Sequence, residues 1–172
     1  MKKLAFLAAV IAVFLTTGCG YKVGNLMHPQ VKSIAIAPVS NDTMLYNAAA
    51  LMRGALAECF QSDGSLKLTS EGTADCILYA RVTKAVFHQI SWENNANDDD
   101  DEFLPDQWQV TVTAKIMIMI PGKADPLIRE TTINGSTKFV TGGDLENSRH
   151  QAVKQACFQA AKAAVVSVTE RW

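Results

Sequence analysis

The segment at residues 107–120, QWQVTVTAKIMIMI, alternates polar and apolar side chains from Gln107 to Ile116. Successive side chains of a β-strand point to opposite faces, so this period of two predicts a strand with one buried face. Met117 and Met119 then make the second face apolar as well, which is typical of a strand end covered on both sides. Because a half-buried strand must pack against another layer, a sheet is the expected centre of the fold.

Four other segments have the pattern of strands. They lie at residues 32–38, 66–68, 76–92 and 127–140. In the longest of them, Val86 and Ile90 share the parity of the apolar positions, whereas Lys84 and His88 interrupt it. We therefore expect its outer half to be less buried or bent.

Two segments space their apolar residues by three to four positions, which predicts amphipathic helices at residues 45–61 and 144–172. The apolar face of the first contains Leu45, Ala49, Met52, Leu56 and Phe60. That of the second contains Val153, Ala156, Cys157, Ala160, Ala164, Val165 and Val168. Gly64 is expected to end the first helix and Asp144 to cap the second. The alanines allow the second helix to lie close to the sheet.

These elements predict an α+β fold, a two-layer sandwich with the order β-α-β-β-β-β-α. One mixed sheet of four to five strands would carry both helices on one face. The helix-free face would be flat and polar, and a partner could use it. The residues expected on that face are Arg81, Thr83, Thr111, Thr113 and Lys115.

The N-terminus has the composition of an export signal. Two lysines precede an apolar run at residues 4–15, which is shorter than the roughly 20 residues that cross a bilayer as a helix. Small residues lead from this run to Cys19, as in a bacterial lipobox, although Thr16 stands where a leucine is usual. We expect cleavage before Cys19 and lipidation of this residue. A plain secretory signal with an incidental cysteine is the alternative.

This interpretation divides the chain into three parts. Residues 1–18 are a signal peptide, residues 19–31 a lipidated N-terminus and tether, and residues 32–172 a single domain. The acyl chains would anchor the protein stably to a membrane. Gly20 follows Cys19 where a retention signal would have aspartate, so the expected location is the outer membrane, facing the periplasm.

The composition and motifs exclude several classes of function. The chain has 172 residues, 48% of them hydrophobic, which suits one globular domain. Its formal net charge of −1 argues against binding to nucleic acid. His28, His88 and His150 are scattered, and no nucleophile motif or phosphate-binding loop occurs. We therefore expect no enzyme, cofactor or metal site.

Three cysteines and an acidic run leave alternatives open. Cys59, Cys76 and Cys157 lie in apolar contexts, so buried free thiols are expected, with a Cys59–Cys157 disulfide as the alternative. The run at residues 98–102 does not fit the register of an EF-hand loop. It is expected to be a solvated hairpin tip, with a weak divalent-cation or partner contact as the alternative.

Several of these features together resemble the LPS-assembly lipoprotein family LptE. They are GCGY after the signal, SIAIAPVSNDT at residues 33–43, a helix ending at Asp-Gly, two long strands and a final helix. The closest local similarity is QWQVTVTAKIMIMIPGKADPLI at residues 107–128. The resemblance implies two helices packed on a mostly four-stranded sheet.

The resemblance also implies a function in assembly, with no bond broken. A member of this family acts as a plug inside an LptD-like outer-membrane β-barrel, and together they place lipopolysaccharide in the outer leaflet. Family members are credited with basic residues that contact the glycolipid near the hairpin tip and after the last strand. Here these regions are acidic, NDDDDEFLPD and TGGDLENS. Direct binding of lipopolysaccharide is therefore expected to be weak, unless a divalent cation bridges these carboxylates and the phosphates of the glycolipid.

Other classes fit parts of the pattern. Curli-type secretion pores and penicillin-binding-protein activators share the opening strand, loop and amphipathic helix, and a pore subunit would form rings. A hydrolase would need a nucleophile and a base that the sequence does not place.

The Cys19→Ser variant tests the anchor. Without the acylated thiol, we expect the protein to move from the membrane to the soluble fraction after cell fractionation. A variant that stayed in the membrane would show that another segment holds it there.

Overall fold

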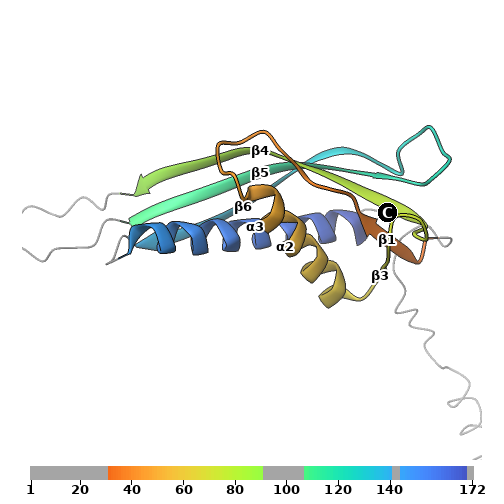
Figure 1. The fold of residues 1–172 in the computed structure, drawn as a ribbon, viewed down its shortest axis with the longest axis horizontal. Coiled ribbons are helices and arrows are strands. Elements are labelled where there is room, and N and C mark those ends of the chain that lie inside the picture. The colour runs from red at the N-terminus through yellow and green to blue at the C-terminus, as the bar shows by residue number, and fades with distance from the viewer. Residues whose placement is uncertain (1–30, 91–106, 141–143, 170–172) are drawn as a thin grey trace, which may run out of the picture.

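The computed structural model describes residues 31–90, 107–140 and 144–169. Its elements are β1 (Ser33–Ile36), β2 (Ser40–Asn41), α2 (Ala48–Asp63), β3 (Lys67–Leu68), β4 (Cys76–Ile90), β5 (Gln107–Met119), β6 (Ile128–Val140) and α3 (Leu145–Thr169). The predicted α+β sandwich is confirmed, because one sheet forms a layer and both helices pack on its same side (Figure 1).

The sheet is mixed and follows the order β3-β1-β4-β5-β6. β1 pairs in parallel with β3 on one side and with β4 on the other, whereas β4, β5 and β6 are antiparallel neighbours. The two-residue strand β2, which the sequence pattern did not predict, pairs with β4 at Arg81 and Val82. The sheet therefore has a short parallel part and a long antiparallel part.

β5 confirms the pattern that predicted it. Five of its apolar positions are buried against the helices, whereas Trp108 at its start is half-buried. The five are Val110, Val112, Ala114, Ile116 and Ile118. Met117 and Met119 are only half-buried, so the described residues do not fully cover the second face of this strand end.

A β-bulge in β4 corrects the expected parity of its outer half. The pairing with β5 shifts between Val82 and Lys84, so Thr83 is the extra residue. Beyond the bulge every side chain changes face, as a one-residue slip requires. Phe87 now packs against the core, and Val86 is 41% exposed. The prediction that Val86 shares the buried face was therefore wrong, and the interruption by Lys84 marked the bend.

The helix α2 begins at Ala48, later than the predicted residue 45. Leu45 belongs to a hydrogen-bonded loop instead, and its carbonyl oxygen accepts from the Ala48 backbone N–H at 3.1 Å. The helix ends as predicted at Gly64, whose φ of 69° is left-handed. The cap of α3 is also confirmed, because the Asn147 N–H donates to the Asp144 side chain at 3.1 Å.

The edge where the chain enters the domain is fixed by Asp75. Its carboxylate accepts hydrogen bonds from the Ser33 hydroxyl at 2.7 Å and from the backbone N–H groups of Ser33 and Lys32 at 2.9 and 3.0 Å. The Ser33 hydroxyl and then the Lys32 N–H lower the pKa of Asp75. This contribution to stability is present above the ordinary pKa of an aspartate and is lost as pH falls through the lowered one.

The three cysteines in the described residues are buried and free. The alternative of a Cys59–Cys157 disulfide is therefore wrong for this structure. Burial raises the pKa of Cys157 to about 11 and that of Cys76, with a further contribution from Asp75, to about 12. Burial also raises the pKa of Cys59. At neutral pH these thiols are protonated and behave as small core residues.

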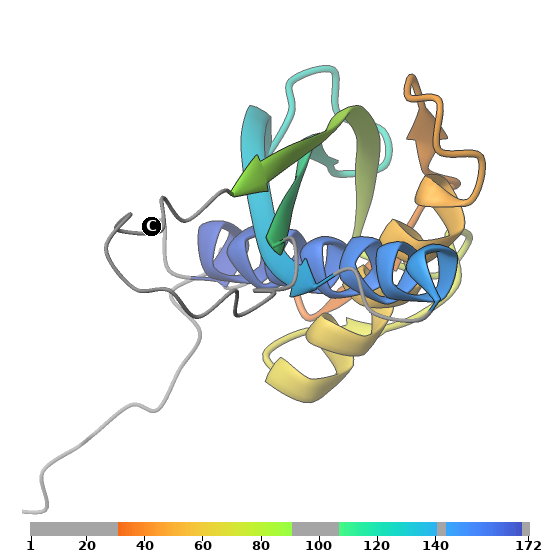
Figure 2. The same cartoon turned by 90° about the vertical axis from the view of Figure 1, so that its left-hand side faces the viewer.

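The two layers approach each other very closely at Gly135 of β6, where α3 crosses the strand (Figure 2). A Cβ atom at this position would overlap the carbonyl oxygen of Ala156 and the backbone nitrogen of Ala160. It would also come within 3.0 Å of the Ala160 Cα. The obstacle is helix backbone, which cannot rotate away, so only glycine fits under the alanine stripe of α3.

Gly135→Ala should therefore lower the free energy of unfolding by about 3 kcal/mol or more, because the helix must move away from the sheet. Urea unfolding of the full chain in detergent would measure the change. Gly72→Ala is the matched control, since a Cβ at Gly72 meets nothing within 4 Å. Equal effects of the two substitutions would contradict the packing argument.

Candidate functional site

The candidate site is the helix-free face, the surface of β4, β5 and β6 that points away from α2 and α3. Three strands of 13 to 15 residues form it, and their register sets which side chains meet. Arg81 lies opposite Lys115. Thr113 lies between Lys84 and Asn134 in the next row.

Four of the five residues predicted for this face lie together on it, namely Arg81, Thr111, Thr113 and Lys115. Thr83 differs because it is the extra residue of the bulge. Its hydroxyl donates a hydrogen bond to the Thr113 carbonyl oxygen at 3.2 Å. Thr83 therefore stabilises the bulge rather than extending the face.

The two cations at the centre of the face are accompanied by carboxylates. Lys115 Nζ lies 2.6 Å from Glu130 Oε1, and Arg81 Nη1 lies 3.7 Å from Asp42 Oδ2. Exposed pairs of this kind stabilise a fold by only about 0–1 kcal/mol. Their larger effect is on binding, since they compensate the two opposed positive charges. The exposed Lys84 in the next row keeps one further positive charge on the face.

The end of the face next to β1 is apolar. Ile77 lies opposite Met119, and Tyr79 lies opposite Met117. Tyr79 is 42% exposed, and the other three side chains are half-buried. Aromatic residues and methionine are enriched in protein–protein interfaces. This end of the face therefore has the composition of a docking surface rather than of a phosphate site.

The described residues contain no cluster of metal ligands. Across residues 31–90, 107–140 and 144–169, no three His, Cys, Asp or Glu side chains come together as metal ligands. His88 is exposed on the helix-free face, and His150 Nδ1 lies 3.1 Å from Asn47 Nδ2 at the helix layer. The two described histidines thus lie on different layers and form no common site.

Two predicted features lie outside the described residues, namely the lipidation site Cys19 and the acidic run at residues 98–102. In the part of the chain that is described, no helix is both long and apolar enough to cross a membrane.

Known proteins share this fold at low sequence identity. No family model and no curated sequence matches the chain. A minor lipoprotein from Acinetobacter baumannii matches with a TM-score of 0.53 at 8% identity, over 82% of this chain and 94% of that one. A putative lipoprotein from Caulobacter crescentus matches with 0.52 at 10% identity, over 79% and 88%.

A third similar structure is a PelC dodecamer from Paraburkholderia phytofirmans, with a TM-score of 0.50 at 8% identity over 85% of this chain and 95% of that one. Such low identities show the fold alone. The chain therefore shares its fold with known lipoproteins. None of these three structures is described as an LptE protein, so the fold leaves the narrower family assignment open.

The carboxylates beside the two central cations can be tested directly. Asp42→Asn with Glu130→Gln should strengthen binding of lipopolysaccharide to the detergent-solubilised full chain several-fold, in a salt-sensitive way, because Arg81 and Lys115 are then uncompensated. Glu146→Gln is the control, since it removes a carboxylate 3.1 Å from Arg149 on α3. Unchanged binding in the double variant would contradict the compensating role.

Proposed function

We propose that this chain is an outer-membrane lipoprotein of the LptE type, which docks an LptD-like β-barrel through its helix-free face and assists in placing lipopolysaccharide at the cell surface. The observation that supports docking is the face itself, which combines an apolar end at Tyr79 and Met117 with a polar centre in which Arg81 and Lys115 are each paired with a carboxylate.

In this proposal, the two sides of the sheet have different functions. The helices bury one side of the sheet, so the core does not depend on a partner. The opposite side offers half-buried apolar side chains, whose burial is favourable, and threonines, whose hydroxyls would need hydrogen-bond partners in the contact. Direct binding of lipopolysaccharide is weak in this proposal, because Arg81 and Lys115 are already accompanied by carboxylates.

A second candidate is a ring-forming envelope lipoprotein, as considered for the secretion-pore and activator classes. The similarity of the fold to a PelC dodecamer favours it. The two candidates differ in what the native lipidated protein binds. A ring would consist of copies of this chain alone, whereas the favoured function requires a large β-barrel.

Purification of the lipidated chain from outer membranes tests the favoured function. We expect a large β-barrel protein to co-purify, and Thr111→Arg with Thr113→Arg to abolish its recovery because two charges would be buried at the contact. Ala163→Arg, at an exposed position of α3, is the control. If no β-barrel co-purified with the unmodified chain, the proposed function in barrel docking would be wrong.

A further inference from the structure

The two edges of the sheet differ greatly in length. One edge is β3, which has two residues, and the other is β6, which has 13. Among the described residues, no strand pairs with the outer side of β6. In an antiparallel edge strand, every second residue directs its N–H and C=O groups away from the sheet. β6 therefore presents a long row of backbone groups that no other strand of the described chain covers.

Only the first part of β6 has the features that usually protect a sheet edge. The register with β5 shifts next to Arg129 and Glu130, which places a bulge and two charges there. From residue 132 to residue 140 the pairing with β5 is regular. This part contains no proline, and Lys138 is its one charged side chain. The second part of the edge is therefore open to pairing with another strand.

A hollow of about 470 Å³ lies along this open part of the edge. It is lined by the end of β6 and by the start of α3. Lys138 and Phe139 both line it, although consecutive residues of a strand point to opposite faces of the sheet. The hollow therefore follows the edge of β6, and the start of α3 forms its second wall.

Three carboxamide side chains form a row on the α3 side of this hollow. They are spaced by four residues, so they lie one above another, about 6 Å apart along the helix. They are Asn147, Gln151 and Gln155. The peptide groups on one side of a strand recur every two residues, at about 6.7 Å. A carboxamide both donates and accepts hydrogen bonds, as a peptide group does, so the row matches an extended backbone in chemistry and in spacing.

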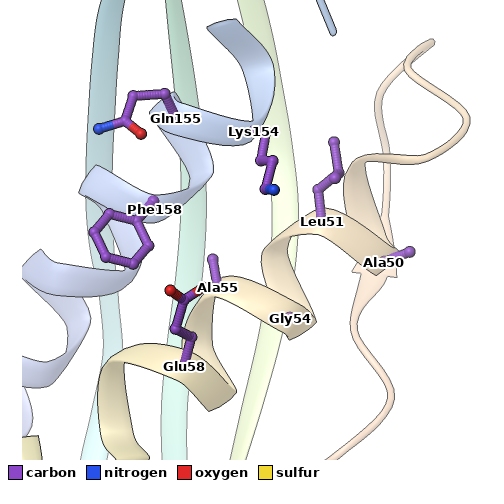
Figure 3. A pocket seen from close by; sticks show the side chains of 8 residues that line it. All are labelled: Ala50, Leu51, Gly54, Ala55, Glu58, Lys154, Gln155 and Phe158. Carbon is purple, nitrogen blue, oxygen red and sulfur yellow. The ribbon is translucent and has the colours of Figure 1, made fainter. Parts of the chain in front are cut away.

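The carboxamide row is separate from the side of α3 that faces α2. Gln155 directs its side chain away from α2, whereas Lys154 points toward that helix (Figure 3). Within residues 31–90, 107–140 and 144–169, none of the three carboxamides is hydrogen-bonded to another residue. They are therefore available to a ligand that enters the hollow.

We propose that residues 132–140 of β6 bind an extended polypeptide segment of a partner protein, which adds to the sheet as a further strand beside the carboxamide row. The backbone of this segment pairs with β6, and its side chains alternate between the helix-free face and α3. Lys138 forms no ion pair with a carboxylate of the described chain. The segment therefore carries an acidic side chain opposite Lys138.

A second copy of this chain does not fit the same place. Pairing of two β6 strands along residues 132–140 would put them about 4.8 Å apart. α3 lies directly over β6 at Gly135, because a Cβ there would meet the backbone of Ala156 and Ala160. The two α3 helices would then be nearly as close as the strands, whereas packed helices need about 8–10 Å. The partner therefore has no helix over its pairing edge, as is true of an extended segment.

Selection from a phage library of random nonapeptides tests the proposal on the detergent-solubilised, lipidated full chain. We expect the enriched peptides to lack proline, to contain alternating β-branched residues and to carry a carboxylate at one fixed position. A bound peptide should slow amide hydrogen exchange most at residues 132–140. Failure to enrich any peptide, enrichment without this pattern, or slowed exchange only at other sites would overturn the proposal.

N-methylation of an enriched peptide separates backbone pairing from side-chain contacts. Methylation of alternate residues removes the N–H donors that face β6, whereas methylation of the intervening residues leaves these donors in place. We expect the first peptide to bind at least about tenfold more weakly, and the second to lose much less affinity. Equal losses for the two methylated peptides would contradict the addition of a strand.

Variants of the chain test the groups that line the hollow. Asn147→Ala with Gln151→Ala and Gln155→Ala should weaken peptide binding about tenfold, and alanine keeps the helix intact. Gln159→Ala is the matched control, since Gln159 is exposed one turn further along α3 and does not line the hollow. Lys138→Gln should weaken only peptides that carry the carboxylate, and should remove the salt dependence of their binding.

Unchanged binding in the triple variant, or an equal loss in the control, would overturn the proposed site. The docking of a barrel on the helix-free face does not depend on this result, because the strands of a closed barrel have no free edge to pair with β6.

Discussion

The contact between the backbone of α3 and Gly135 of β6 is the constraint on which the arrangement of the molecule depends. The helix lies so close to the strand that no Cβ fits between them. The stripe of alanines on α3 keeps the helix at this distance along its length, and valines fill the spaces at its two ends. With the helices packed this tightly on one side, the sheet keeps its opposite side free for other uses.

The main elements of the fold follow from the sequence because their periodicities are long. β5 alternates without interruption, and the buried stripe of α3 is the predicted one. The features that could not be predicted depend on single residues whose effect appears only after pairing. The interruption of the pattern at Lys84 indicated a bend in β4, but it did not show that Thr83 is the extra residue after which the side chains change face. The close approach at Gly135 is equally hidden, since the strand pattern alone does not say which residue lies under the helix.

The candidate site could also be predicted only in part from the sequence. Alternation placed Arg81, Thr111, Thr113 and Lys115 on one face. It could not show that Arg81 and Lys115 are direct neighbours, because this requires the register of two strands. The carboxylates beside them come from the β2–α2 loop and from β6, far from either cation in sequence. The exposed Met44 and Tyr46 were also missed, because the apolar spacing predicted that the helix begins at Leu45, which instead lies in the loop.

The position of β1 has a mechanical consequence for a protein held by its N-terminus. The chain enters the domain just before Ser33, and β1 lies between two parallel neighbours, β3 and β4. A pull on the N-terminal segment along the strand direction would load the ladders on both sides in shear, so their hydrogen bonds would have to yield together rather than one after another. The Asp75 carboxylate accepts hydrogen bonds from the backbone N–H groups of Lys32 and Ser33, so these bonds would bear the force first. If the expected lipidation of Cys19 occurs, the anchor would load the domain at the end where the two parallel ladders resist force together.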